Sequence, residues 1–395
     1  MVKIKKYPAN VLILFLLLFL YAISDMQNSS VTYNAGSDRS SVYFFLIAII
    51  LFLGINDIFY LIKNNWKYTV TPVFICLLLI AVWITVLDIF RHVSLWTAFT
   101  HLGLCSMWLL GYMFFQFLFE YKQAYLDKIS QCFFLIFALY VCAIFYYFYD
   151  VQIRKGLIPV LNLAYNVVVV VPWLFGLTSG KKRAVVMILS LAAIILSLKR
   201  GALIVLPLMF IAGLMIEAKR KKKVNSTLIK IILFLILFVI IAFAVNSQTD
   251  GFLFERFSAD ELESGSGRTE IYRMALDNIF KRDLFDLVVG LGSGASARII
   301  GTGCHNEWLE FLFSFGIVGL LLYLILIIVL IKNVIHIRYK LPDYYGPSIM
   351  MLLYVLIIGM IGGIYFIHSS FFFFSFWGAM QGTIKARQRR FCHDR

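Results

Sequence analysis

Charged side chains are scarce in this chain of 395 residues, of which 14% are Asp, Glu, Lys or Arg and 62% are hydrophobic. A soluble globular domain needs more polar side chains to cover its surface, so that class is excluded. The hydrophobic residues occur in runs of about 20, the length that crosses a ~30 Å hydrocarbon core as a helix. The sequence therefore predicts an all-α, polytopic integral membrane protein.

Internal repeats, low-complexity linkers and a separate soluble domain are also lacking, so residues 1–395 are expected to form a single polytopic membrane domain. Cysteine is sparse, with six in the chain. Four fall in predicted spans and Cys392 in the C-terminal tail, which leaves Cys304 as the cysteine outside. No intramolecular disulfide is therefore expected. Cys304 is also not expected to act as a nucleophile with His305, because chain neighbours rarely face each other.

About twelve transmembrane helices are predicted from the hydrophobic runs. They cover residues 9–24, 41–62, 69–90, 94–118, 130–149, 157–178, 184–198, 201–217, 228–246, 306–331, 347–366 and 370–384. No A-x-A-like cleavage site follows the first run, so we expect it to be retained as a span. Phe371 to Phe374 are expected to face lipid, and Asp57 and Asp88 to be hydrated helix ends.

Lysine and arginine clusters flank these spans on one side. Cytoplasmic loops of membrane proteins carry an excess of such residues. Counted over twelve spans, every cluster falls at a terminus or an even-numbered connection, which predicts that both termini are cytoplasmic. The clusters are Lys3 to Lys6, Lys63 and Lys67, Lys122 and Lys128, 181–183, 219–223, Lys332 to Lys340, and 385–395. The net charge of +15 is thereby explained by topology and by attraction to the lipid bilayer, and no nucleic acid partner is expected.

One long polar segment, residues 247–305, is predicted on the opposite, extracytoplasmic side. Several cations occur there against the positive-inside bias, namely Arg256, Arg268, Arg273, Lys281, Arg282 and Arg298. Apolar residues recur at 3.6-residue spacing from Ile271 to Phe280, which predicts an amphipathic helix over 269–281 at the outer membrane surface or on the helix bundle. We expect the chemistry of the protein in this loop.

The loop ends in two polar elements. Gly290, Gly292 and Gly294 permit backbone conformations and close approaches that other residues avoid. The segment lacks the Gly-Lys-Ser/Thr ending of a P-loop. His305 then precedes the tenth span, where Asn306 is a favoured N-cap and Glu307 suits the positive end of the helix dipole.

These motifs resemble the O-antigen polymerase and O-antigen ligase superfamily of bacterial surface-polysaccharide enzymes. Their order, spacing and common side of the membrane carry the resemblance, which covers roughly residues 160–335. Lys199 departs from the usual small polar residue. The matching elements are Ser197-Leu198-Lys199-Arg200-Gly201-Ala202, Gly267-Arg268 with Tyr272-Ala275-Leu276, Gly290-Leu291-Gly292-Ser293-Gly294, and His305-Asn306-Glu307-Trp308-Leu309-Glu310 followed by Phe315-Gly316-Ile317-Val318-Gly319.

The resemblance implies glycosyl transfer from an undecaprenyl-pyrophosphate-linked glycan on the outer face of the bacterial cytoplasmic membrane. An acceptor hydroxyl would attack the anomeric carbon, and lipid pyrophosphate would leave. Arg200 and Arg268 match family arginines and are predicted to bind the pyrophosphate, since a guanidinium binds phosphate oxygens bidentately. Arg273 is a third, weaker candidate, and His305 is the predicted general base.

Asn306, Glu307, Gly290 and Gly292 are predicted to support these residues. No metal and no cofactor are expected, because the acidic stretch 260–263 lacks the ligand spacing of a known metal site. A chain-length regulator or a flippase is a further possible partner.

Three functions remain open. Polymerisation of lipid-linked repeat units into O-antigen, capsule or exopolysaccharide is favoured. The motif His-Asn-x-Trp-Leu-Glu and the modest chain length resemble those of polymerases more closely than those of ligases. The alternative is a ligase that transfers polymer to lipid A-core. A twelve-span secondary transporter is the second alternative, against which stands the lack of inverted repeats.

Overall fold

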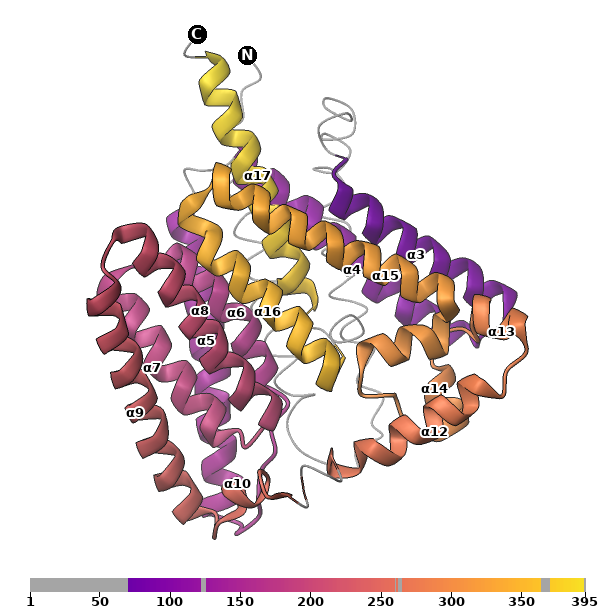
Figure 1. Ribbon diagram of the computed structural model, residues 1–395, viewed down its shortest axis with the longest axis horizontal. Helices are drawn as coiled ribbons and strands as arrows, with labels where there is room; N and C mark the ends of the chain where they lie inside the picture. The colour runs from indigo at the N-terminus through magenta and orange to yellow at the C-terminus, as the bar shows by residue number, and fades with distance from the viewer. Residues whose placement is uncertain (1–69, 122–125, 260, 262–264, 364–369, 394–395) are drawn as a thin grey trace. The chain divides into compact units, whose positions relative to one another are not determined.

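The computed structural model describes residues 70–121, 126–259, 261, 265–363 and 370–393, and every regular element in these ranges is helical (Figure 1). The long elements are α3 (Pro72–Phe90), α4 (Leu95–Tyr121), α5 (Leu126–Phe148), α6 (Ala164–Leu177), α7 (Gly180–Leu196), α8 (Arg200–Lys221), α9 (Val224–Gln248), α12 (Arg268–Phe280), α15 (Glu307–Lys340), α16 (Tyr345–Ile361) and α17 (Ser370–His393). The short ones are η2 (Tyr149–Ile153), α10 (Phe252–Glu255), η3 (Gly265–Gly267), α13 (Leu284–Val289), α14 (Ala295–Ile300) and η4 (Pro342–Tyr344).

Seven helices in the described part of the chain are long and apolar enough to cross a membrane. They are Pro72–Phe90, Leu95–Tyr121, Leu126–Ile153, Arg200–Lys221, Val224–Gln248, Glu307–Lys340 and Pro342–Ile361. The predicted spans 9–24 and 41–62 lie outside the described residues, and the count of about twelve is not confirmed. The predicted span 157–178 forms a helix only from Ala164 onwards, because residues 156–163 are irregular or turn.

The described chain packs as two compact units. One unit contains Leu110–Lys199 and the chain from Phe372 onwards, and the other contains Val70–Leu109 and Arg200–Phe371. Each unit brings together segments that are far apart in the sequence. All eight residues predicted to form or support the site lie in the second unit.

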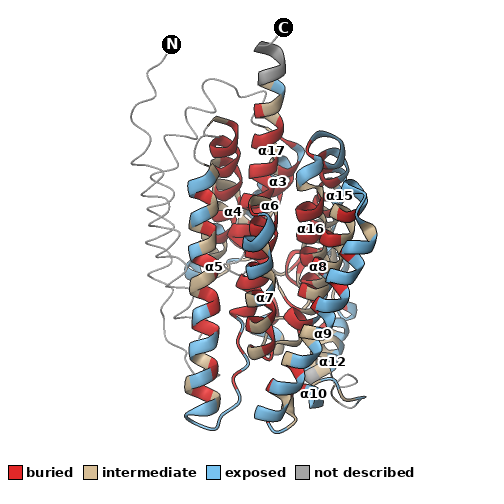
Figure 2. Ribbon diagram, turned by 90° about the vertical axis from the view of Figure 1, so that its left-hand side faces the viewer, coloured by how far each residue is buried: buried red, intermediate tan, exposed pale blue. Residues whose placement is uncertain are grey.

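The first unit is built around Trp173 of α6. Its ring stacks on Phe133 with centroids 4.3 Å apart, and its indole N–H donates to the Phe372 carbonyl at 3.0 Å. Phe371 to Phe374 are buried, with exposed fractions of 2% or less. The expectation that they face lipid was wrong, because aromatic packing of this kind buries the start of α17. Along α5, by contrast, exposed residues alternate with buried ones (Figure 2).

Two glycines of α17 allow it to approach α4 closely within the first unit. A Cβ on Gly378 would lie 2.0 Å from the Tyr112 carbonyl oxygen, and one on Gly382 would lie 2.2 Å from the Gln116 carbonyl oxygen. Small residues four apart are the usual means by which membrane helices bring their backbones together. The α4–α17 contact is therefore fixed by backbone against backbone.

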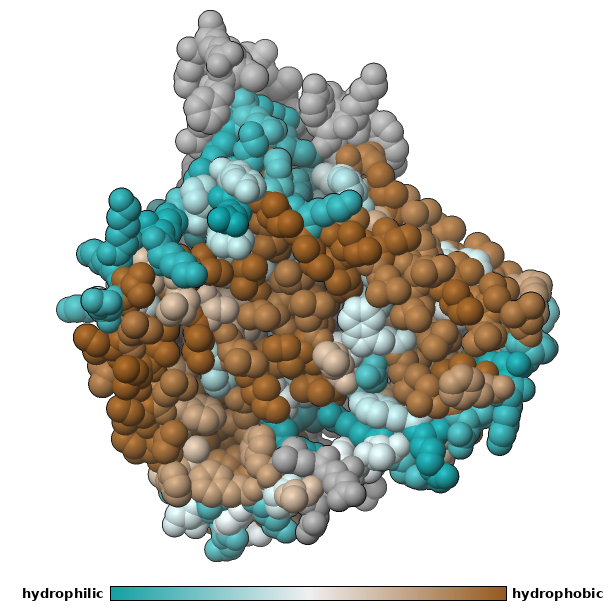
Figure 3. Space-filling model, in the orientation of Figure 1, coloured by the Kyte–Doolittle hydropathy of each residue, from teal (hydrophilic) through white to brown (hydrophobic). Residues whose placement is uncertain are grey.

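In the second unit, α15 packs on α3 and on α16, and α16 packs on α8. Gly213 of α8 and Gly346 of α16 meet at this last contact, where a Cβ on Gly346 would lie 3.3 Å from the Gly213 carbonyl oxygen. The outward face of α9 is apolar and exposed, from Leu228 to Phe243. This face contributes to the brown surface of Figure 3, as expected of a helix in contact with lipid.

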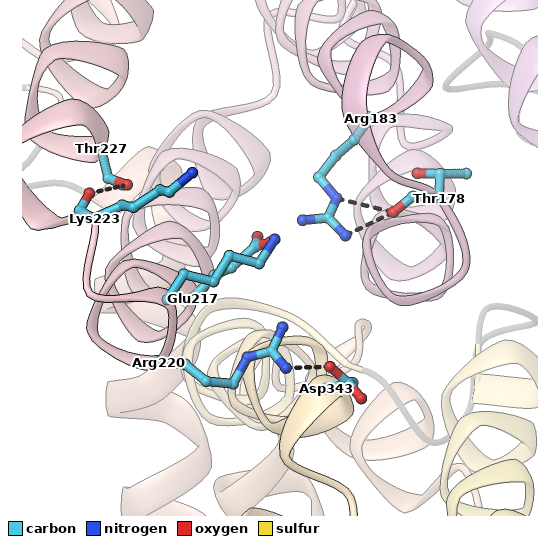
Figure 4. A network of polar contacts seen from close by, with 8 residues as sticks. Thr178, Arg183, Glu217, Arg220, Lys223, Thr227 and Asp343 are labelled. Carbon is cyan, nitrogen blue, oxygen red and sulfur yellow. Dashed lines mark hydrogen bonds and ion pairs between the residues drawn. The ribbon is translucent and has the colours of Figure 1, made fainter.

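The basic end of α8 is tied to the end of α15. Arg220 forms an ion pair with Asp343 of η4, three residues after the end of α15 at Lys340 (Figure 4). In the adjoining turn, the Thr227 hydroxyl donates to the Lys223 carbonyl at 3.0 Å. Figure 4 also draws a contact within the first unit. There, Arg183 donates from Nε and Nη2 to the Thr178 carbonyl, at 3.1 and 2.6 Å. The basic clusters 219–223 and 332–340 are predicted on the same side of the membrane. The Arg220–Asp343 ion pair brings them together at one end of the second unit.

Candidate active site

His305 is an exposed side chain on a backbone in an unusual conformation. Its φ angle is +50°, in the left-handed region that only a few per cent of non-glycine residues adopt. The imidazole Nε2 lies 3.4 Å from the Thr302 hydroxyl. Residues held in such conformations need surrounding contacts that fix them, and they concentrate at functional sites.

Both neighbours of His305 are fixed by hydrogen bonds. The Cys304 N–H donates to Glu310 Oε2 at 2.9 Å. The Asn306 amide oxygen accepts from the Leu309 N–H at 3.1 Å, which confirms Asn306 as the N-cap of α15, and its amide nitrogen donates to the Met360 carbonyl at 3.1 Å. The imidazole is therefore presented from a short backbone segment held at each end.

Glu310 organises this segment. Besides the Cys304 N–H, its carboxylate accepts from the Ser296 hydroxyl at 2.8 and 2.9 Å and from the Ser314 hydroxyl at 2.7 Å. Glu310 thus joins α14 to α15, and its role is to hold the backbone before His305. Glu307 is 1% exposed and lies beside Gly359 and Gly363.

A break in α15 shapes the floor of the loop. Gly316 has φ +68° and ψ −169°, so residues 307–315 and 317–340 form two helical segments. A Cβ on Gly316 would lie 2.4 Å from the Val288 carbonyl oxygen, and one on Gly290 would lie 2.5 Å from the Phe315 carbonyl carbon. Glycine is required at both positions because the two backbones are in contact.

The break leaves carbonyl groups of α15 without partners in the helix, and other segments supply the donors. The Leu291 and Gly292 N–H groups donate to the Ser314 carbonyl at 3.0 and 2.8 Å. The indole of Trp83 in α3 donates to the Phe315 carbonyl at 3.1 Å, and Arg282 donates to the Phe313 carbonyl at 2.7 Å. The glycine segment is thereby anchored to α15, and α15 is tied at its break to α3.

Asp88 of α3 is a second anchor for the glycine segment. It is 2% exposed, and its Oδ1 accepts from the Ser293 N–H at 2.7 Å. A Cβ on Gly292 would lie 3.3 Å from the same oxygen. The expectation of a hydrated helix end was wrong at Asp88, because the loop folds over this carboxylate. Asp57 lies outside the described residues.

The predicted amphipathic helix 269–281 is confirmed as α12. Figure 1 shows α12, α13 and α14 close to the start of α15, and Ala275 and Ile279 pack in one apolar cluster with Ala295, Cys304 and Phe313. The helix therefore lies against the membrane helices. Phe280 at its end is 80% exposed, as is suitable for a side chain at a lipid surface.

Tyr272 joins α12 to His305. Its hydroxyl donates to the His305 carbonyl at 3.3 Å, and burial raises the pKa of this phenol. Arg268 lies one turn earlier on α12, and its charge opposes that rise in the pKa of Tyr272. Within the part of the chain that the structure describes, the half-buried Arg268 side chain has no ion-pair partner. Arg268 thus lies one helical turn from the tyrosine that contacts the His305 backbone.

The other predicted arginines are engaged within the loop. Arg200, 14% exposed, donates to the Arg256 and Glu261 carbonyls at 2.8 and 3.2 Å and lies 3.8 Å from the Glu261 carboxylate. It tethers the first part of the loop to the start of α8. Arg273 is exposed and pairs with Glu270 at 2.6 Å. Exposed pairs of this kind contribute little to stability, about 0–1 kcal/mol.

Cys304 is buried, and this burial, with Glu310 beside it, raises the pKa of its thiol. A protonated buried thiol is a poor nucleophile, in agreement with the prediction that no Cys/His dyad operates here. Among the described residues, no group of three His, Cys, Asp or Glu side chains is placed to hold a metal ion. Of the acidic stretch 260–263, only Glu261 is described.

Four residues of this region were not predicted from the sequence: Asp88, Trp83, Glu310 as an anchor of Cys304, and Arg282 as a donor to the helix break. Asp88 carried a usable signal, since a carboxylate within a predicted span is a functional candidate by default. Trp83 carried no such signal, because a tryptophan within a hydrophobic run is normally interpreted as an apolar packing residue.

The helices and this loop define a polytopic integral membrane protein whose loop carries an exposed histidine, a half-buried arginine and an anchored glycine segment. Residues 185–324 match a family model described as O-antigen ligase, a range that contains all eight predicted site residues. The match confirms the resemblance to the O-antigen ligase and polymerase superfamily. No match is found among curated proteins.

Proposed function

We propose that the protein polymerises oligosaccharide repeat units carried on undecaprenyl pyrophosphate, on the outer face of a bacterial cytoplasmic membrane. The superfamily match supports a glycosyltransferase of the ligase or polymerase kind. The observation that supports the site assignment is the contact of Tyr272, one turn from Arg268 on α12, with the His305 carbonyl.

The chemistry follows from these groups. The acceptor hydroxyl gives its proton to the His305 imidazole as its oxygen forms a bond to the anomeric carbon of the donor. The bond from that carbon to the pyrophosphate oxygen breaks, and the oxygen keeps the electron pair. Arg268 and Arg200 stabilise the negative charge on the leaving group, Arg273 adds an outer charge, and no metal takes part.

The surrounding residues hold this arrangement. Asn306 and Glu310 fix the backbone on either side of His305, while Gly290 and Gly292 place the glycine segment against α15. Glu307, buried beside Gly363, fixes the start of α15. Both glycan lipids reach the site from the bilayer, and a flippase or a chain-length regulator acts with the enzyme in the membrane.

The decisive test replaces His305 by Gln and by Asn in the purified, reconstituted enzyme. Neither amide accepts the proton, while Asn tolerates the left-handed backbone found at this position. A general base contributes about 10² to 10⁴ in rate, so both variants should lose product by at least about a hundredfold at normal protein level. His336→Gln, an exposed histidine at the far end of α15, is the matched control.

Near-normal product from either His305 variant would remove the general base from the mechanism. The same assay separates polymerase from ligase. With lipid-linked repeat units as the sole substrate, a polymerase yields longer chains on the lipid carrier. A ligase yields product only when a lipid A-core acceptor is added.

A further inference from the structure

A groove lies between the C-terminal end of α3 and the first turns of α4, within the second unit. Its volume is about 450 Å³, which is in the range of small-ligand sites, about 300–1,000 Å³. None of the predicted site residues lines it. The lining residues are Thr85, Asp88, Ile89, Leu95, Trp96, Ala98, Phe99 and Leu102.

Asp88 is the charged side chain of this groove, and one of its oxygens lacks a partner. Oδ1 accepts from the Ser293 N–H, whereas Oδ2 is buried and accepts no hydrogen bond from any described residue. A buried carboxylate oxygen without a donor is unfavourable, and such atoms in native proteins call for an explanation. An occupant of the groove with a hydroxyl or amide N–H group would supply the missing donor.

The walls define the rest of the occupant. Trp96 and Phe99 are 53% and 56% exposed, and Leu95 and Ile89 beside them are also exposed. Such walls favour an occupant with an apolar face, and the Asp88 charge disfavours a phosphate or pyrophosphate. A neutral sugar ring has both features, because one face carries C–H groups and its edges carry hydroxyl donors.

We propose that this groove binds a neutral sugar ring of a lipid-linked glycan, with the ring face on Trp96 and a hydroxyl donating to Asp88 Oδ2. The lipid-linked source of the sugar rests on the proposed function, whereas the recognition of a sugar rests on the groove. Because Asp88 Oδ1 holds Ser293, the same carboxylate contacts both the sugar and the glycine segment. The groove thus gives the glycan a subsite separate from the arginines that bind pyrophosphate.

The test measures binding of octyl β-glucoside, below its micelle concentration, to the full-length protein in phosphatidylcholine nanodiscs. Saturation-transfer NMR reports contact of the sugar protons with the protein. Trp96→Leu should weaken binding roughly threefold to tenfold through loss of the ring. Asp88→Asn keeps an acceptor for the Ser293 N–H but removes the charge, and should weaken binding roughly tenfold.

Phe243→Leu is the matched control, because Phe243 is an exposed aromatic residue of α9 outside the groove. It should bind as the unaltered protein does. Octanol and octyl phosphate are the comparison probes. Equal binding of octanol would make the groove a site for lipid tails, and stronger binding of octyl phosphate would make it a phosphate site. Either result would overturn the proposal, as would unchanged binding in both groove variants.

This measurement needs no turnover, so its failure is distinguishable from failure of the proposed function. His305→Gln should bind octyl β-glucoside normally while losing product. If the groove binds the sugar but the His305 variants remain active, the sugar subsite is supported and the proposed catalytic mechanism is wrong.

Discussion

At the scale of single residues, the three predicted arginines differ in what their guanidinium groups already contact. Arg200 holds carbonyl groups of the loop, and Arg273 pairs with Glu270 in solvent. Arg268 is half-buried beside Tyr272 and without an ion-pair partner among the described residues. Of the three, Arg268 is therefore the one that we propose as the main contact of the pyrophosphate.

Arg268→Lys should lose most activity although the charge is retained, because an ammonium cannot form the paired hydrogen bonds of a guanidinium. A loss of about 10- to 150-fold corresponds to the roughly 1.5–3 kcal/mol of a hydrogen bond to a charged group. Arg273→Lys, which keeps its exposed pair with Glu270, should remain within about threefold of the unaltered enzyme. Product amount at matched protein level measures both. Equal activity of the two variants would withdraw Arg268 from the pyrophosphate site.

The sequence predicted the types of residue in this region better than their contacts. His305, Asn306 and Arg268 were identified from local motifs, and Asn306 caps α15 as the motif indicates. Asp88 accepts from the glycine segment and Trp83 donates to the Phe315 carbonyl at the break in α15, although both residues lie more than 200 positions earlier in the chain. No local pattern reports a hydrogen bond over that separation, so these contacts could not be derived from the sequence.

At the scale of elements, α15 consists of two helical segments that meet at a break at Gly316. The predicted span 306–331 begins correctly at the Asn306 cap, but the break at Gly316 was not predicted, because a glycine within a hydrophobic helix is often tolerated. Helix α12 was predicted to within one residue at each end, since its apolar residues recur at helical spacing. Periodicity thus located the element, whereas tertiary contacts decided where α15 breaks.

Gly316→Ala should destabilise the loop. Its φ of +68° with ψ of −169° is open to glycine almost alone, at a backbone cost of roughly 1–3 kcal/mol for other residues. The added Cβ would also overlap the Val288 carbonyl. We expect a lower unfolding temperature and faster tryptic cleavage at Lys281. In Gly303→Ala, the matched control, the added Cβ would lie 3.8 Å from Glu310 Oε2. Unchanged stability and cleavage in Gly316→Ala would show that the break is not needed to hold the loop.

At the scale of the whole molecule, the pattern of positive charges and the contacts within the second unit distinguish the same two ends of that unit. The basic turn 219–223 and the end of α15 meet through Arg220 and Asp343, and Arg200 at the other end of α8 holds the loop. The 22 residues of α8 cover about 33 Å, close to a bilayer core. Of the twelve predicted spans, the first two lie outside the described residues.

Cysteine labelling tests which end faces outward. In a chain with Cys142 and Cys392 replaced by Ser, Ala297→Cys in α14 should react with a membrane-impermeant maleimide in intact cells. Asn225→Cys in the basic turn should react only after permeabilisation, because lysine-rich connections remain in the cytoplasm. Both positions are exposed in the structure. Reaction at Asn225→Cys alone in intact cells would reverse the proposed orientation.

The hydrogen bonds at the break in α15 also set an order of events during synthesis. The glycine segment and Arg282 leave the ribosome before Ser314 and Phe313, whose carbonyls are their acceptors. At roughly 5–20 residues per second, the chain from Gly292 to Ser314 takes about 1–4 s to be synthesised. Until Ser314 has been made, the glycine segment has no acceptor on α15, so the nascent protein passes through a stage in which this segment depends on Asp88 of α3 for its anchorage.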